Sequence, residues 1–211
     1  LSTHAVEQSL VGVNVSDAVA YTYQLEGHEF YVVTFPQADL TWVFDLATGL
    51  GHKWLEWDNL TGYHRHRSNC GAFFAGFNLV GDYENGKVYA LDNTVYTDNG
   101  TTIRRMRRAI HLTNDLQRQF FDEFQIQFQP GVGLPTGQGD NPQAMLRWSN
   151  DGGSTWSNEH WVSIGKIGRY QNRAIWRRLG WSRDRIFEVS VSDPVKTVIV
   201  SANLKATEGE N

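Results

Sequence analysis

Short apolar runs separated by polar, glycine-containing turns repeat along most of the chain, and this pattern predicts β-strands. The first group holds an alternating segment, a continuous apolar run and two further runs, which are AVAYTYQL (18–25), EFYVVTF (29–35), LTWVFDL (40–46) and HKWLEW (52–57). Four strands joined by short turns have the size of one blade of a β-propeller, roughly 40–45 residues.

A second group begins with the apolar run GAFFAGFNLV (71–80), which predicts one strand. GDYENG (81–86) follows as a hairpin turn, because Asn and Gly tolerate the positive φ that such turns need. KVYALD (87–92) is the next expected strand. Asp45 and Asp92 each follow an apolar run, 47 positions apart, which indicates either a weak internal repeat or chance, since Asp often ends strands.

The pattern of apolar and polar positions changes after residue 112. LTNDLQRQFFDEF (112–124) is compatible with a short helix or a connection, and FQIQFQ (124–129) predicts a half-buried strand. PGVGLPTGQGDNP (130–142) is a long loop, and loops of this length usually bind something or move. The remaining expected strands lie in 144–149, 155–165, 173–180, 183–193 and 194–204.

These elements predict an all-β fold of antiparallel sheets, with part of a β-propeller as the first choice and a β-sandwich as the alternative. The expected organisation is propeller-like blades over 1–112, a C-terminal β-region over 113–205, and a polar, frayed tail over 206–211. The chain begins with Leu1, and we expect it to be the C-terminal part of a longer chain.

The stretch SNDGGSTW (149–156) predicts a tight hairpin, in which glycines supply positive φ and Asp151 accepts hydrogen bonds from the turn. It resembles the Asp-box of sialidase-type and related propellers, a motif that lies on the outer edge of a blade, away from the catalytic centre. The expectation is therefore a structural turn and not a catalytic acid. Its residues are Ser149, Asp151, Gly153, Thr155 and Trp156.

The net charge of −4 does not mark the whole molecule as a polyanion binder. Arginines nevertheless outnumber lysines, 14 to 5, and cluster in two segments. Arg, Tyr and Trp dominate protein interfaces, so these segments are candidate interfaces, with internal ion pairs and contact with DNA as the alternatives. The candidate residues are Arg104, Arg105, Arg107, Arg108, Arg173, Trp176, Arg177 and Arg178.

Other reactive residue types give weak signals. His64 and His66 would share one face of a strand, as zinc ligands can, but no third ligand is indicated and an exposed polar segment is favoured. Cys70 is the only cysteine and opens an apolar strand, which favours a buried thiol. No apolar run approaches the roughly 20 residues that span a bilayer. We therefore expect no catalytic residue, no metal site, no cofactor and no membrane span.

Several phrases together carry a resemblance over nearly the whole chain. They are GHEFYVVTFP, TWVFDLATG, GVGLPTGQGDNPQAMLRWSNDGGSTWS and IGKIGRYQNRAIWRRLGWSRDRIFEVSVSDPVK. These phrases resemble the C-terminal part of the packaged-DNA stabilisation proteins of short-tailed bacteriophages, also called tail accessory or tail hub proteins.

The resemblance implies a virion protein that performs no catalysis. Such a protein is made in the host cytoplasm and assembles in the tail as a homo-oligomer, with a six-fold ring expected. It helps to close the portal channel, retains packaged DNA, and contacts portal or adaptor, needle and tailspike proteins. The residues leave two other functions open, a glycan-binding β-module with exposed Trp side chains and a sialidase-like hydrolase.

Overall fold

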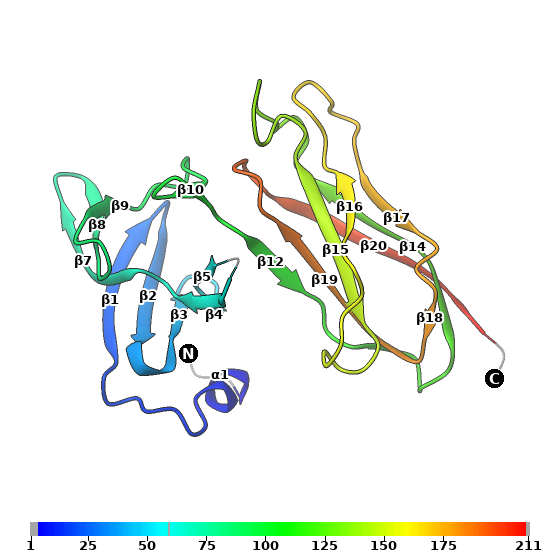
Figure 1. Cartoon of the computed structure of the whole chain (residues 1–211), viewed down its shortest axis with the longest axis horizontal. Helices are drawn as coiled ribbons and strands as arrows, with labels where there is room; N and C mark the ends of the chain where they lie inside the picture. The colour runs from blue at the N-terminus through cyan, green and yellow to red at the C-terminus, as the bar shows by residue number, and fades with distance from the viewer. Residues whose placement is uncertain (1–3, 59, 210–211) are drawn as a thin grey trace. The chain divides into compact units, whose positions relative to one another are not determined.

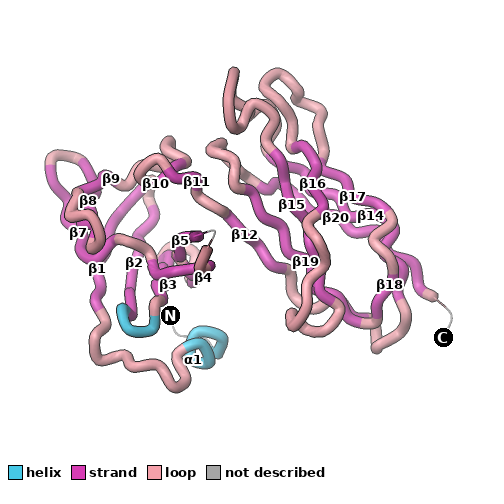
Figure 2. Tube along the Cα trace, viewed as in Figure 1, coloured by secondary structure: helices cyan, strands magenta, loops and turns pink. Residues whose placement is uncertain are grey.

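The computed structural model describes residues 4–58 and 60–209, and its regular secondary structure is almost entirely β-strand (Figure 1). The chain divides into two compact units, Leu1–Asn93 and Thr94–Asn211. All strand pairs among the described residues are antiparallel. Loops and turns join the successive strands (Figure 2). The all-β, antiparallel prediction is therefore confirmed.

The N-terminal unit builds each sheet from strands that follow one another in sequence. Its four-stranded sheet has the order β1-β2-β3-β4, and the smaller sheets have the orders β5-β6 and β7-β8-β9. The elements are α1 (His4–Ser9), β1 (Val19–Leu25), β2 (His28–Phe35), η1 (Pro36–Ala38), β3 (Leu40–Asp45), β4 (Leu50–Lys53), β5 (Leu55–Asp58), β6 (Gly62–Arg65), β7 (Ser68–Phe74), β8 (Phe77–Asp82) and β9 (Val88–Ala90).

The four-stranded sheet has the blade-like arrangement that the apolar runs predict, with one difference at its last strand. Residues 52–57 do not form one strand: Trp54 still donates its N–H to the carbonyl of Thr41 on β3, and the residues after it pair with β6 instead. β4 and β5 lie on either side of this break. The core of this unit is small and consists of Val6, Phe35, Leu40, Trp42 and Phe44.

The run at 71–80 is a hairpin, not the single strand that its apolar composition predicts. Ala75 and Gly76 both have positive φ, 51° and 85°, and they turn the chain between β7 and β8. Two consecutive positive φ values match the right-handed twist of a tight hairpin. The turn leaves three large side chains strongly exposed, those of Phe73, Phe74 and Phe77.

The C-terminal unit has two main sheets that pack face to face. One has the order β12-β19-β15-β16, with β13 also paired to β19, and in the other β14 pairs with β17, β18 and β20. The elements are β10 (Thr97–Asp98), β11 (Thr101–Thr102), β12 (Arg105–Arg108), β13 (Leu112–Thr113), β14 (Gln119–Phe128), β15 (Gln143–Ser149), β16 (His160–Ser163), β17 (Ala174–Arg177), β18 (Trp181–Ser182), β19 (Asp184–Val191) and β20 (Ile199–Glu208).

One core joins these two sheets. β14 and β17 contribute side chains from one sheet, and β15 and β19 contribute side chains from the other. This is the layer arrangement of a sandwich, in which alternate residues of facing sheets interdigitate. The buried residues are Phe121, Ile126, Phe128, Ala144, Leu146, Ile164, Ala174, Trp176, Leu179, Phe187, Val189, Val191 and Val195.

Three segments of the C-terminal unit differ from the sequence expectations. Residues 119–124 are part of the ten-residue strand β14 and form neither a helix nor a connection. Residues 206–208 belong to β20 and pair with β14, so this part of the expected tail is ordered strand, while 210–211 lie outside the described residues. The compact units divide after Asn93, not after residue 112, because β12 pairs with β19.

Candidate functional site

The stretch 149–156 forms a turn whose side chains bond to its own backbone. Asp151 accepts hydrogen bonds from the Thr155 hydroxyl at 2.6 Å, from the Thr155 N–H at 2.9 Å, and from the Ser149 hydroxyl at 2.7 Å. The Ser149 hydroxyl oxygen also accepts from the N–H of Gly153 at 2.8 Å. Glycines 152 and 153 have φ values of 72° and 98°, which side-chain-bearing residues rarely adopt.

These bonds decide the chemistry that Asp151 can perform. The hydroxyl of Thr155, followed by its N–H and the Ser149 hydroxyl, holds the pKa of Asp151 far below its usual range. A carboxylate held in its charged form by three donors is a poor general acid. The geometry therefore agrees with the expected structural turn, whose assignment as an Asp-box stays a prediction.

Trp156 anchors this turn to the adjacent sheet. Its Nε1 donates to the carbonyl of Gly153 at 3.0 Å, and two guanidinium groups stack on its ring, Arg108 and Arg147, each 4.7 Å from the ring centroid. Both arginines also pair with Glu188, which lies between them on β19. The Arg108 pair spans 2.7 Å and the Arg147 pair 2.5 Å, and the Glu188 side chain is only 2% exposed. Two charge partners compensate the burial of this carboxylate.

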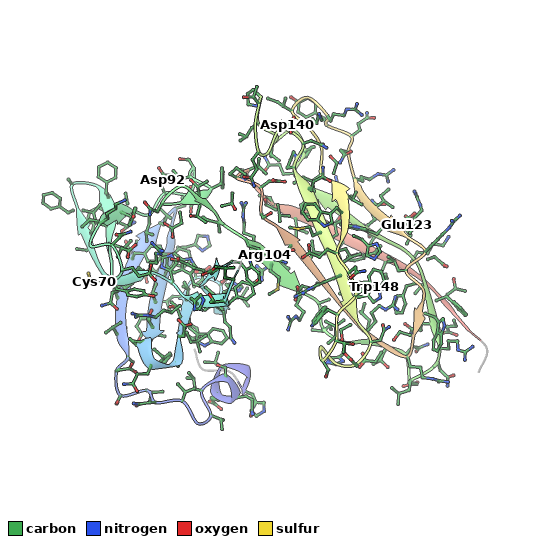
Figure 3. All side chains as sticks on the ribbon, viewed as in Figure 1. Cys70, Asp92, Arg104, Glu123, Asp140 and Trp148 are labelled. Atoms are coloured by element: carbon green, nitrogen blue, oxygen red, sulfur yellow. The ribbon has the colours of Figure 1, made fainter. Side chains whose placement is uncertain are left out.

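Two further candidate arginines bond within their own unit. Arg104, labelled in Figure 3, donates to Glu159 at 2.8 Å and to Ser190 at 3.3 Å. Arg105 donates to the carbonyls of Asp193 and Val195 and to the Thr197 hydroxyl. Burial lowers the pKa of Arg105. The contacts of Arg105 hold the segment that leads into β20. Arg104 and Arg105 thus bond inside the unit, which is the alternative to an interface role.

The second arginine segment divides between core and surface. Trp176 is 4% exposed, its Nε1 donates to the carbonyl of His160, and its ring lies in the core, so we leave it out of the proposed interface. Arg177 pairs with Glu123 at 2.8 Å on the exposed face of the sheet. Of the candidate residues named from the sequence, the arginines that are exposed without a described ion pair are Arg107, Arg173 and Arg178.

Arg185 is a buried arginine that the sequence analysis did not single out. It is 1% exposed and donates to the carbonyl of Leu179 at 2.6 Å, to that of Trp181 at 3.1 Å, and to the Asn150 side chain at 2.9 Å. Its guanidinium group also stacks on Phe121 and Trp148, and Trp148 is labelled in Figure 3. Burial lowers the pKa of Arg185 to about 10, so it remains charged at neutral pH.

His66 occupies a buried polar seam of the N-terminal unit. Its ring stacks on Trp54 with centroids 3.5 Å apart, its Nδ1 lies 2.7 Å from the Ser68 hydroxyl, and that hydroxyl lies 2.6 Å from the Tyr21 hydroxyl. Burial lowers the pKa of His66 to about 3. The expectation of an exposed polar segment is therefore wrong at His66, because aromatic and hydroxyl groups enclose the ring.

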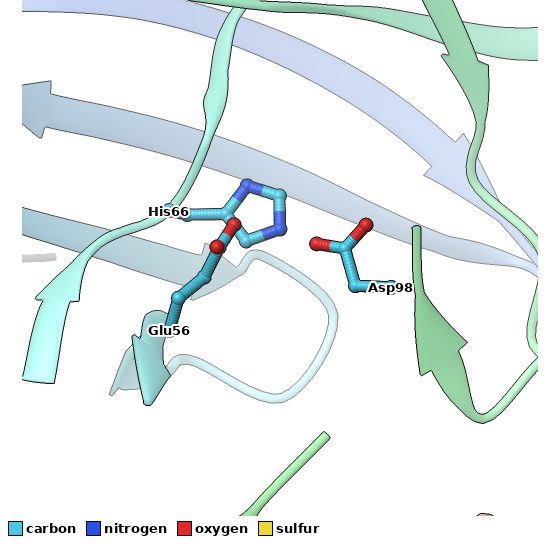
Figure 4. Close-up of side chains that lie close together, drawn as sticks. All are labelled: Glu56, His66 and Asp98. Atoms are coloured by element: carbon cyan, nitrogen blue, oxygen red, sulfur yellow. The ribbon is translucent and has the colours of Figure 1, made fainter. Parts of the chain in front are cut away.

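His64 lies apart from that seam, whereas Cys70 lies near its Tyr21. His64 is partly exposed, and its two ring nitrogens contact Asp39 and Thr61, each at 2.7 Å, so it does not share a ligand-like face with His66. Figure 4 shows the side chains of His66 and Glu56, and Glu56 accepts hydrogen bonds from the N–H and Nε of Arg67. Cys70 is exposed, so the expectation of a buried thiol is wrong.

Turns of the N-terminal unit share a pattern that the sequence analysis missed. In DLATG (45–49) and DNLTG (58–62), the Asp accepts from the N–H two residues on and from the Thr hydroxyl three residues on. Asp82 of DYENG (82–86) likewise accepts from two turn N–H groups. The signal was the spacing Asp-x-x-Thr/Asn-Gly, whereas the proposed repeat compared Asp45 with Asp92.

The loop 130–142 packs against the loop 164–173 at one end of the sandwich (Figure 2). A Cβ at Gly133 would lie 2.8 Å from the backbone nitrogen of Ile167, so the two loops approach too closely for any larger residue. Ile167 and Tyr170 stay 56% and 71% exposed. The loop pair is therefore a packed, partly apolar surface, and its role in binding stays a prediction.

Comparison with known families matches both units. A family model described as Bacteriophage P22 Gp10, beta-propeller, matches residues 1–96. A second, described as Bacteriophage P22 Gp10, beta-sandwich, matches residues 104–207. No curated protein matches the chain. The two expected architectures are thus both present, the propeller type in the N-terminal part and the sandwich type in the C-terminal part.

Proposed function

This chain belongs to the bacteriophage P22 Gp10 family of phage stabilisation proteins, structural tail proteins, and from this premise we propose that it helps to close the portal channel and retain packaged DNA. The observation that carries the proposal is that models from one phage protein match both units of the chain. The proposed mechanism is structural and needs no catalytic step. Within the described residues, no helix has the length and apolarity needed to cross a membrane.

The proposed assembly is a homo-oligomeric ring, with six copies, that contacts portal or adaptor, needle and tailspike proteins. The exposed arginines Arg107, Arg173 and Arg178 support the proposal, since they have no described ion pair and Arg is enriched in interfaces. The loop 130–142 with its neighbour 164–173 is a second proposed contact, because its packed glycines present Ile167 and Tyr170 to solvent.

The test uses phage particles that carry the variant chain. Changing both Arg107 and Arg178 to Glu should lower the fraction of particles that retain DNA, measured by nuclease-accessible DNA after capsid filling. The double variant Lys53→Glu with Lys196→Glu is the matched control, because it makes the same change of charge at two exposed positions outside the proposed interface. Equal DNA retention in the arginine variant and the control would remove these arginines from the proposal.

One observation favours a second function, a glycan-binding module. Trp161 and Trp181 are 60% and 50% exposed on the sandwich, and exposed Trp rings stack on sugar faces. A sugar titration of the purified chain should change its Trp fluorescence, and Trp161→Ala should abolish that change. Hydrolysis of a fluorogenic sialoside by the chain would instead support the sialidase-like alternative and contradict a purely structural role.

A further inference from the structure

The last strand of the sandwich leaves one long edge without a partner. β20 spans ten residues and pairs with β14, and no other strand of the described residues pairs with it. The opposite edge strand of the same sheet, β17, has four residues. Long strand edges carry rows of backbone donors and acceptors that can pair with another chain.

The side chains of β20 alternate as if one face were buried. Pairing with the core residues of β14 places Ala202, Leu204 and Ala206 on the core side of the sheet, and polar residues Ser201, Asn203 and Lys205 on the other side. This alternation is the pattern of a half-buried strand.

The second sheet does not cover that apolar side. Leu204 is 36% exposed and Ala202 and Ala206 are exposed, although they face the core. On β17, the equivalent core-facing residues Ala174 and Trp176 are 0% and 4% exposed. The sandwich is therefore closed at β17 and open at β20.

The backbone groups of the same three residues point to the empty edge. Phe121, the partner of Ala206, exchanges its backbone hydrogen bonds with Leu179 and Gly180, on the other side of β14. The N–H of Gly209 donates to the carbonyl of Arg118. The odd-numbered residues of β20 therefore direct their backbone N–H and C=O groups toward β14. Because antiparallel pairs alternate, the backbone groups of Ala202, Leu204 and Ala206 face outward.

The charge of Lys205 on β20 indicates which charge a strand paired with this edge should carry. Glu123 lies between Arg177 and Lys205 across three strands, but its carboxylate bonds to Arg177. No ion pair joins Lys205 to an acidic group in the described part of the chain. Opposite charges on directly facing residues of two strands attract and like charges repel, so Lys205 favours an acidic residue opposite it on an added strand.

We propose that β20 accepts an extended segment of another polypeptide, with apolar side chains at alternate positions and an acidic residue opposite Lys205. The segment adds a strand to the sheet and covers Ala202, Leu204 and Ala206, which is recognition by strand addition. Only the identity of the partner as a tail protein rests on the proposed function. The contact itself is tested without phage particles.

The probes are two blocked eight-residue peptides of alternating Val and Thr, one with a central Glu and one with a central Lys. Each is titrated into the ¹⁵N-labelled full chain. The acidic peptide should shift the amide signals of Ala202, Leu204 and Ala206 and slow their hydrogen exchange. It should bind about two- to five-fold more tightly than the basic peptide, the range of one cross-strand charge pair. Lys205→Glu should reverse this preference.

Ala206→Pro supplies the backbone control, because proline removes an outward N–H and is tolerated on strand edges. It should weaken the acidic peptide at least about five-fold, whereas Ala206→Ser should not. Three results overturn the proposal: no shift at the three amides, equal affinity for the two peptides, or peptide-independent pairing of β20 with a second copy. Failure of the DNA-retention test with intact peptide binding would affect the proposed function alone.

Discussion

The two units use the same strand-and-turn sequence pattern but connect their strands differently. In the N-terminal unit every sheet pairs consecutive strands, as in β1-β2-β3-β4. In the C-terminal unit β12 pairs with β19 and β14 with β20, which are far apart in the chain. Local pairing needs little loop closure, whereas distant pairing must be supported by a shared core.

The difference appears in how each unit is held together. Among the described residues, thirteen buried side chains form one core between the sheets of the C-terminal unit, whereas five form the core of the N-terminal unit. Both units hold buried polar contacts, but in the part of the chain that the structure describes only those of the N-terminal unit enclose a neutral histidine, His66 of the His66–Ser68–Tyr21 seam. The C-terminal unit should therefore respond most to apolar truncation, and the N-terminal unit to protonation.

The largest effect is expected from Phe187→Ala in the C-terminal unit. Phe187 is 2% exposed and its ring contacts those of Phe121, Phe124 and Trp148. Loss of this ring should lower the free energy of unfolding of that unit by about 3–5 kcal/mol. Calorimetry of the full chain should show one transition shifted and the other unchanged. Phe73→Ala, at an exposed ring, is the control, and equal shifts in both transitions would contradict the division into units.

The free energy of unfolding of the N-terminal unit is expected to fall by about 2 kcal/mol between pH 7 and pH 5. His66 has a folded pKa of about 3, depressed by burial below the ordinary 6.5. The unfolded chain therefore binds a proton that the folded chain rejects, and stability is lost as pH falls through 6.5 toward 3. Urea unfolding at several pH values measures this slope. His66→Gln should flatten it, and an unchanged slope would show that His66 is not the titrating group.

Sequence patterns found the locally connected parts of the fold. Alternation located β1, whose burial has period two, and apolar runs located β2 and β3, the last of which is buried at every position. They failed where one run held two strands, at Ala75-Gly76, since only backbone φ reveals the turn. They also could not pair β14 with β20, because nothing local in either strand specifies a distant partner.

The candidate residues show the same limit. The hydrogen bonds of the turn at Asp151 follow from residue types within eight positions, and they form as expected. The fate of each arginine depends on distant partners, as when Arg108 and Arg147 meet Glu188 from opposite sides. The composition shows how many arginines there are but not where they lie. Arg105 and Arg185 bond to backbone carbonyls, whereas Arg107 is exposed, and nothing in the sequence distinguishes them.

A smaller effect is expected from the turns themselves. Ser149 is 1% exposed and accepts from the N–H groups of Asp151 and Gly153. Ser149→Ala removes a buried hydroxyl that accepts from two N–H groups and donates to Asp151, so it should cost the C-terminal unit about 1–2 kcal/mol, measured by urea unfolding. Thr48→Val removes an exposed hydroxyl that donates to Asp45, and it should cost the N-terminal unit less. Equal costs would mean that burial does not distinguish the two kinds of turn.

The pairing of β14 with β20 has a consequence for synthesis on the ribosome. Gln119, the first residue of β14, pairs with Glu208, so this sheet cannot be completed until codon 208 has been translated. The blade formed by β1 to β4 needs only the codons for residues 19–53. A nascent chain arrested before codon 199 should thus carry a formed blade and an open, chaperone-accessible second unit.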